Sequence, residues 1–189
     1  MKKEIFLSFK PEFFRPILYG IKKYEYRKRF GNEEVRAYLY LSAPIKKVIG
    51  ILELGKPIII EEVISEYEKN SEQYKRLKKC LDNREKYAIP IKSFRLIKNP
   101  IGIEKIKEIE KFNVPQCYLD LKNYSKILEY LKEQEYYEKE FENEHDKIYE
   151  NNIGMSCKEM EQTREFKKVD EQYNSNKKYD IVETKYLTK

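Results

Sequence analysis

The stretch GIKKYEYRKRF, residues 20–30, holds five cations and three aromatic rings within eleven residues. Its segment YEYRKR alternates as a β-strand does, so Glu25 and Arg27 are expected on one face and the tyrosines on the other. Lys22 lies at the mouth of this strand. A carboxylate flanked by cations is held ionised and can accept hydrogen bonds from a ligand. The stretch therefore predicts a strand that carries a charged site.

Two interpretations of this site are open. In the first, the cations bind phosphates and the tyrosines stack on bases, as in many complexes with single-stranded nucleic acid. In the second, the cations face solvent and Glu25 and Arg27 form an ordinary salt bridge. The residues of the stretch favour neither interpretation over the other.

The flanking sequence predicts short strands that alternate with helices, and hence an α+β fold. Apolar or alternating runs predict the strands, while apolar residues at helical spacing, with Ser71 as an N-cap, predict the helices. The expected strands are 4–9, 24–29, 35–43, 46–55 and 86–98, and the expected helices are 11–20, 57–70, 71–83 and 103–112.

Charge divides the chain of 189 residues into two parts. Residues 1–118 contain 26 Lys and Arg against 16 Asp and Glu, a formal charge of +10, whereas residues 119–189 contain 13 against 17, a charge of −4. This asymmetry predicts an anion-binding domain followed by an acidic extension. The extension is expected to be helical over 121–141 and partly disordered beyond about residue 142.

Composition argues against several other classes of protein. The three cysteines are odd in number and widely spaced, which disfavours a disulfide framework or a zinc site. His145 lies among carboxylates, and this acidic run is interpreted as solvated rather than metal-binding. No apolar run is long enough to span a membrane, and the first residues do not read as a signal peptide. We therefore expect a soluble, cytoplasmic protein without a metal or other cofactor.

The stretch Gly20–Arg27 resembles the GxKxxExR signature of the ASCH family, within the PUA-like superfamily. Two further segments resemble the family in the same order. YLSAP, residues 40–44, is followed by the strand VIGILELG, and PQCY, residues 115–118, resembles a closing segment of some members. The resemblance covers roughly residues 3–118.

The resemblance implies a small, mixed, partly open β-barrel with surrounding helices and a basic cleft at the motif. This ASCH/PUA-like domain would span residues 1–118, with the helical extension added at 119–189. Such domains are associated with RNA or modified nucleotides, so a binding module for these is the leading expectation. The expected nucleic-acid-binding residues are Lys22, Lys23, Tyr24, Glu25, Tyr26, Arg27, Arg29, Tyr40 and Ser42.

Two alternative functions are kept. The first is a hydrolase acting on an acylated nucleoside or on RNA, with Lys22 and Glu25 as the candidate catalytic residues. In the amidohydrolases that the motif resembles, a threonine occupies the position of Glu25, and a carboxylate cannot act as the same hydroxyl nucleophile. The second is a protein-interaction or regulatory factor, in which the acidic C-terminal segment docks a partner or masks the cleft. Ligand identity and oligomeric state stay open.

Overall fold

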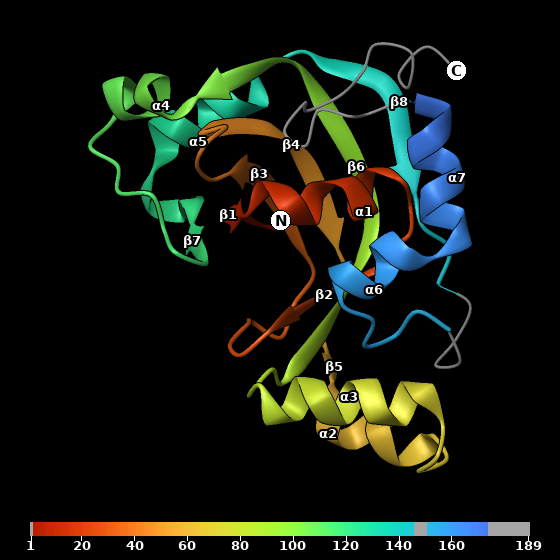
Figure 1. Cartoon of the computed structure of the whole chain (residues 1–189). Coiled ribbons are helices and arrows are strands. Elements are labelled where there is room, and N and C mark those ends of the chain that lie inside the picture. Colours follow the sequence, from red (N-terminus) through yellow and green to blue (C-terminus); the bar gives the residue numbers. More distant parts are fainter. Residues whose placement is uncertain (1, 146–150, 174–189) are drawn as a thin grey trace.

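A computed structural model describes residues 2–145 and 151–173 (Figure 1). No helix in these ranges is long and apolar enough to cross a membrane. The strands are β1 (Lys3–Phe9), β2 (Tyr24–Arg27), β3 (Val35–Leu41), β4 (Lys47–Leu54), β5 (Ile58–Ile59), β6 (Tyr87–Gly102), β7 (Tyr118–Asp120) and β8 (Tyr136–Glu142). The α-helices are α1 (Phe14–Leu18), α2 (Ile60–Val63), α3 (Glu72–Asp82), α4 (Ile103–Ile109), α5 (Ser125–Lys132), α6 (Cys157–Gln162) and α7 (Arg164–Tyr173). Single 3-10 turns are η1 (Pro11–Phe13), η2 (Ile64–Glu66) and η3 (Leu121–Asn123).

The strands form one mixed sheet in the order β2-β6-β4-β3-β1-β7, and β5 and β8 also pair with β6. β1 runs parallel to β3, while the other pairs are antiparallel. The long strand β6 pairs with four different strands along its length, so the sheet curls around it into a half-barrel (Figure 1). The expected α+β fold with a partly open barrel is confirmed.

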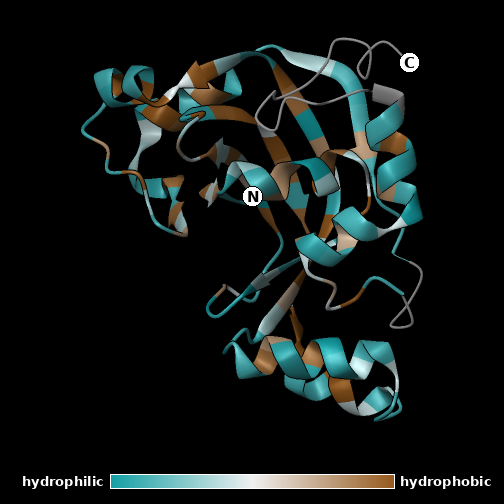
Figure 2. Ribbon diagram, in the orientation of Figure 1, coloured by the Kyte–Doolittle hydropathy of each residue, from teal (hydrophilic) through white to brown (hydrophobic). Residues whose placement is uncertain are grey.

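Both faces of the sheet are buried, which explains why its strands read as nearly continuous apolar runs. Along β1, Ile5 and Leu7 enter one apolar cluster with Phe94, and Phe6 enters a second cluster with Tyr40. Figure 2 shows the hydrophobic colour concentrated on the strands and on the inner sides of the helices. The face of β3 that carries Arg36, Tyr38 and Tyr40 is the more polar one in sequence, but α4 and α5 cover it, so it is a second core.

α3 lies in a lobe that projects from one end of the sheet together with α2 and β5 (Figure 1). The prediction of Ser71 as the N-cap of α3 is confirmed, because its side chain accepts a hydrogen bond of 3.2 Å from the backbone N–H of Tyr74. The helix expected over 57–70 is instead broken into β5, α2 and η2. Three consecutive β-branched isoleucines start that segment, and two of them pair with β6.

The segment expected to be helical over 121–141 is helical only in part. α5 bears out the helical prediction, whereas residues 136–142 form β8, which pairs antiparallel with β6. From Tyr137 onward, the side chains of β8 alternate between half-buried and exposed, and the ring of Phe141 stacks on Phe94 of β6 at 6.1 Å between centroids. The open edge of β6 thus outweighs the helical propensity of this glutamate-rich segment.

Beyond residue 150, two helices return to the domain. The Phe166 ring of α7 lies 5.1 Å from the Tyr19 ring, and the Asp170 carboxylate lies 3.4 Å from the Arg15 guanidinium of α1. Part of the expectation of disorder beyond residue 142 falls on residues 146–150 and 174–189, which lie outside the described residues. The boundary at residue 118 stays a prediction.

Candidate functional site: a charged cavity at strand β2

A tight turn after α1 brings Lys22 to the start of β2. Gly20 adopts a left-handed conformation, with φ of +71°, which glycine reaches without a steric cost. The backbone N–H groups of Ile21 and Lys22 then donate to the carbonyl oxygen of Pro16 at 2.9 and 2.8 Å. The glycine of the motif therefore positions its lysine.

Lys22, Glu25 and Arg27 form one ion cluster, which confirms that the predicted side chains meet. The Nζ atom of Lys22 lies 3.1 Å from one Glu25 carboxylate oxygen, and the Nε atom of Arg27 lies 2.8 Å from the other. The Nε–H bond of Arg27 does not point at that oxygen, so this contact is an ion pair rather than a hydrogen bond. The Lys22 and Glu25 side chains are only 7% and 10% exposed.

The Lys22 amine is held in its protonated form. Burial lowers its pKa, but the charge of Glu25 and a hydrogen bond to it raise the pKa, and the balance is a raised value. A lysine that acts as a general base needs a lowered pKa. The geometry therefore makes Lys22 a hydrogen-bond donor and a positive charge rather than a base.

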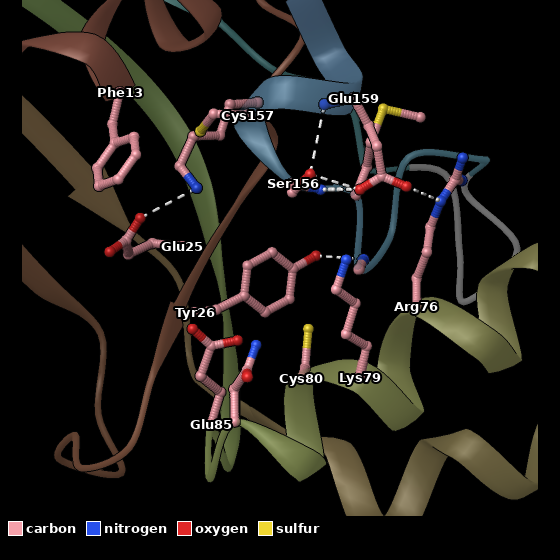
Figure 3. A pocket seen from close by; sticks show the side chains of 14 residues that line it. Phe13, Glu25, Tyr26, Arg76, Lys79, Cys80, Glu85, Ser156, Cys157 and Glu159 are labelled. Atoms are coloured by element: carbon pink, nitrogen blue, oxygen red, sulfur yellow. Dashed lines mark hydrogen bonds and ion pairs between the residues drawn. The ribbon is translucent and has the colours of Figure 1, made fainter.

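A cavity of about 220 Å³ opens beside this ion cluster (Figure 3). Figure 3 shows the Tyr26 ring between the α3 side chains and the segment that carries Ser156 and Cys157. Its walls thus come from three parts of the chain that lie far apart in sequence. They include Lys22, Glu25 and Tyr26 of the motif, Arg76, Lys79 and Cys80 of α3, and residues 154–157 with Glu159.

Residues 151–159, called here the C-terminal wall, close one side of the cavity. The backbone N–H of Gly154 donates to the Tyr26 hydroxyl. The Arg76 guanidinium of α3 donates to the carbonyl oxygen of Asn151 at 3.0 Å and lies 3.4 Å from the Glu159 carboxylate. Glu159 also closes a capping box with Ser156 at the start of α6. Contacts to both β2 and α3 therefore hold the wall in place.

The other predicted site residues do not line this cavity. Lys23 donates to the carbonyl oxygen of Glu144 at 2.9 Å, and Tyr24 is buried. Arg27 contacts the Glu25 carboxylate without lining the cavity, and Arg29 is exposed beyond the end of β2. Tyr40 packs in the second core with its ring 5.4 Å from Phe6, and Ser42 follows the end of β3. The site thus centres on Lys22, Glu25 and Tyr26.

Sequence reasoning missed the contributions from α3 and the C-terminal wall, because no local pattern links them to the motif. Glu142 and Glu144 are exposed, as expected for a solvated acidic run, but His145 is half-buried: its ring packs edge-on against Tyr24 at 5.2 Å, and its Nε2 atom lies 2.9 Å from the Ile91 carbonyl oxygen. Within residues 2–145 and 151–173, no group of three or more His, Cys, Asp or Glu side chains could hold a metal ion.

The three cysteines are expected to differ sharply in reactivity at pH 7. Burial raises the pKa of Cys157 and raises that of Cys80 to about 12, whereas Cys117 is exposed. Because the thiolate is the reactive form, an aromatic disulfide reagent should modify the exposed Cys117 quickly and Cys80 at least about a hundredfold more slowly. Cys117→Ser should remove the fast phase. Two or more fast thiols in the folded protein would contradict this assignment.

Comparison with solved structures finds three similar chains from Zymomonas mobilis. The crystal structure of ASCH from that organism is 26% identical and has a TM-score of 0.51, with 70% of this chain and 96% of that chain covered. A serine-to-alanine variant and a tyrosine-to-phenylalanine variant of it match with the same identity and TM-score, and cover 71% of this chain. No protein-family model matches the sequence, and no curated protein matches it.

The curled mixed sheet with its surrounding helices defines the class: this is a PUA-like α+β domain. The likeness to the Zymomonas mobilis structures covers nearly the whole of those chains. The likeness therefore supports the assignment of an ASCH domain to this chain.

Proposed function

We propose that the cavity at β2 binds a single nucleotide of RNA, or a modified nucleotide, and that the protein is a recognition module. The observation that carries the proposal is the buried pair of Lys22 and Glu25 in the cavity wall. The ammonium donates hydrogen bonds and the carboxylate accepts them, side by side. A nucleobase edge presents acceptors and donors at this spacing, and polar groups of RNA bases are read by such hydrogen bonds.

The size and lining of the cavity support one base rather than a stack of bases. At about 220 Å³ the cavity is smaller than the 300–1,000 Å³ that is typical of drug-sized ligands. The ring of Tyr26 provides an aromatic surface beside the ion cluster, and aromatic rings stabilise unstacked bases. Its hydroxyl group already accepts from the Gly154 N–H, which fixes the orientation of the ring.

The raised pKa of Lys22 supports binding more than hydrolysis, since it keeps the amine protonated. The hydrolase with Lys22 and Glu25 as catalytic residues stays a prediction without support from this geometry. The masking hypothesis also stays a prediction. The C-terminal wall lines the cavity, and Glu144 and His145 contact Lys23 and Tyr24 of the motif.

Lys22→Met is the test of the proposed function. Methionine keeps most of the side-chain volume but removes the three donors and the charge, so affinity for a short single-stranded RNA should fall about tenfold or more. The measurement is fluorescence anisotropy with labelled RNA, recovered intact on a denaturing gel. Urea unfolding of the same sample checks that the variant is folded.

Lys105→Met is the matched control. Lys105 lies on α4, is exposed and forms an ion pair with Glu108 at 3.1 Å, so its loss should leave binding within about twofold of wild type. If Lys22→Met binds RNA as tightly as the wild-type protein does, the proposed site is wrong. If both variants lose affinity equally, the binding reflects net charge alone.

A further inference from the structure

Exposed cations lie together beside the mouth of the cavity, along the end of α3 and the end of β2. Figure 1 places α3 in the projecting lobe and β2 between this lobe and the rest of the sheet. Lys79 belongs both to the lining of the cavity and to this group of exposed cations. We call this group the basic edge: Lys79, Arg84, Lys86, Lys28 and Arg29.

Backbone contacts hold the two halves of the basic edge together. The N–H of Lys86 donates to the carbonyl oxygen of Arg27 at 3.0 Å, and Arg27 pairs with Tyr87 in the ladder between β2 and β6. This places Lys28 and Arg29, which follow Arg27, beside the turn that follows α3. The cations therefore form one surface although they come from two segments.

The cations of the basic edge are not neutralised within the described part of the chain. None of the five forms an ion pair with a carboxylate there, and each is exposed. Exposed lysines elsewhere are often paired: Lys75 lies 2.8 Å from Glu72, and Lys107 lies 3.0 Å from Glu104. The edge thus presents positive charge that a ligand can use.

Two acidic residues lie between Lys79 and Lys86, and they do not cancel the positive charge of the basic edge. Asp82 is exposed at the end of α3, and Glu85 lines the cavity, where it interacts with the Cys80 thiol. Five cations against two carboxylates leave an excess of about three positive charges. An excess of this kind attracts a polyanion and makes its binding dependent on salt.

We infer that the basic edge binds the phosphate backbone of a single-stranded RNA whose nucleotide occupies the cavity. The inference rests on the proposed function and narrows it: the ligand is a nucleotide within a strand and not a free nucleoside. Lys79 contacts the phosphate at the cavity mouth, and the strand continues along Arg84 and Lys86. The basic edge recognises the charge of the phosphates, so this part of the contact carries no base preference.

The test combines Lys79→Gln, Arg84→Gln and Lys86→Gln in the full chain. Binding to a labelled RNA of about 12 nucleotides is measured at about 50 and about 200 mM salt. Removing three phosphate contacts should weaken binding about tenfold or more at the lower salt concentration. It should also reduce the slope of log affinity against log salt by about 2, since each contact contributes about 0.7 for single strands.

The matched control replaces three exposed lysines near α4 and α5, which Figure 1 places at the opposite end of the molecule. It has the same change in net charge, and none of its three lysines forms an ion pair with a carboxylate in the described residues. Its affinity and salt slope should stay close to those of wild type. An equal loss in the control overturns the inference. The control substitutions are Lys111→Gln, Lys122→Gln and Lys126→Gln.

A mixture of mononucleotides separates the inference from the proposed function. A variant with only Arg84→Gln and Lys86→Gln, which leaves the cavity lining unchanged, should bind mononucleotides as wild type does, while Lys22→Met should lose both ligands. If Lys22→Met loses RNA binding but the basic-edge variant keeps the wild-type affinity and salt slope, only the inference about the edge fails. If Lys22→Met keeps the wild-type affinity for both ligands, the proposed function fails, and the inference that rests on it fails as well.

Discussion

Glu25→Gln should lower the free energy of unfolding by about 3–5 kcal/mol at pH 7. The substitution keeps the shape of the side chain but leaves Lys22 and Arg27 without the negative charge between them. Removing one partner of a buried ion pair has a cost of this size, because the remaining charge is desolvated and uncompensated. Urea-induced unfolding, followed by far-UV circular dichroism, gives the midpoint and slope from which the change is calculated.

The ion cluster stabilises the fold only at pH values where Lys22 is protonated. Its pKa is raised in the folded state above the ordinary value of 10.5. Stability linked to a raised pKa is fully present below the unfolded value and is lost only as the pH rises through the folded value. The effect of Glu25→Gln is therefore complete at pH 7, and the wild-type protein should lose this contribution only above about pH 10.5.

Two further variants separate charge burial from packing. Glu72→Gln removes an exposed pair with Lys75 at 2.8 Å and should change stability by less than about 0.5 kcal/mol. Combining Glu25→Leu with Lys22→Met and Arg27→Met removes every charge of the cluster and should recover most of the lost stability. This triple variant should still fail to bind RNA. A stability loss below about 1 kcal/mol in Glu25→Gln would contradict the burial of the cluster.

Gly154→Val should detach the C-terminal wall from the domain. Gly154 has φ of +73°, where a β-branched residue is strongly strained. A Cβ atom there would lie 2.7 Å from the Cβ of Arg76 and 3.0 Å from the backbone nitrogen of Leu77, so α3 and the wall cannot keep their contact. We expect a loss of about 2–4 kcal/mol in the local stability of residues 151–173.

Limited trypsin digestion measures this detachment, because Lys158 and Arg164 lie in and just after the wall. The variant should be cut there at least about tenfold faster than wild type. Gly31→Val is the control: its Cβ would meet nothing within 4 Å, so its digestion should match wild type. Cutting of Gly154→Val at the wild-type rate would show that the wall does not depend on this contact.

RNA binding by Gly154→Val decides what the C-terminal wall does. The wall contributes residues 154–157 and Glu159 to the cavity, and it orients Tyr26 through the Gly154 N–H. If the wall is part of the binding site, its detachment should weaken RNA binding about tenfold. Tighter binding by the variant would instead support the masking hypothesis, in which the C-terminal segment covers a site that is complete without it.

Local sequence determined the parts of the structure that depend on neighbours in the chain. The spacing of Glu25 and Arg27 places them on one face because a strand returns to the same face every second residue, while the turn at Gly20 brings Lys22 to the same carboxylate. The cap at Ser71 fixes the start of α3. Alternation between short strands and helices was sufficient to predict the α+β class. The resemblance of residues 20–27 to a known signature pointed to the family.

Only the tertiary structure decided which surfaces cover which faces. The alternation in β3 correctly separated its two faces, but it could not show that α4 and α5 bury Tyr40. Nor could it show that the edge of β6 draws residues 136–142 into a strand. The cavity joins β2 to α3 and to a wall more than a hundred residues downstream. Periodicity fixes the direction of a side chain, whereas its neighbours depend on long-range packing that no local pattern encodes.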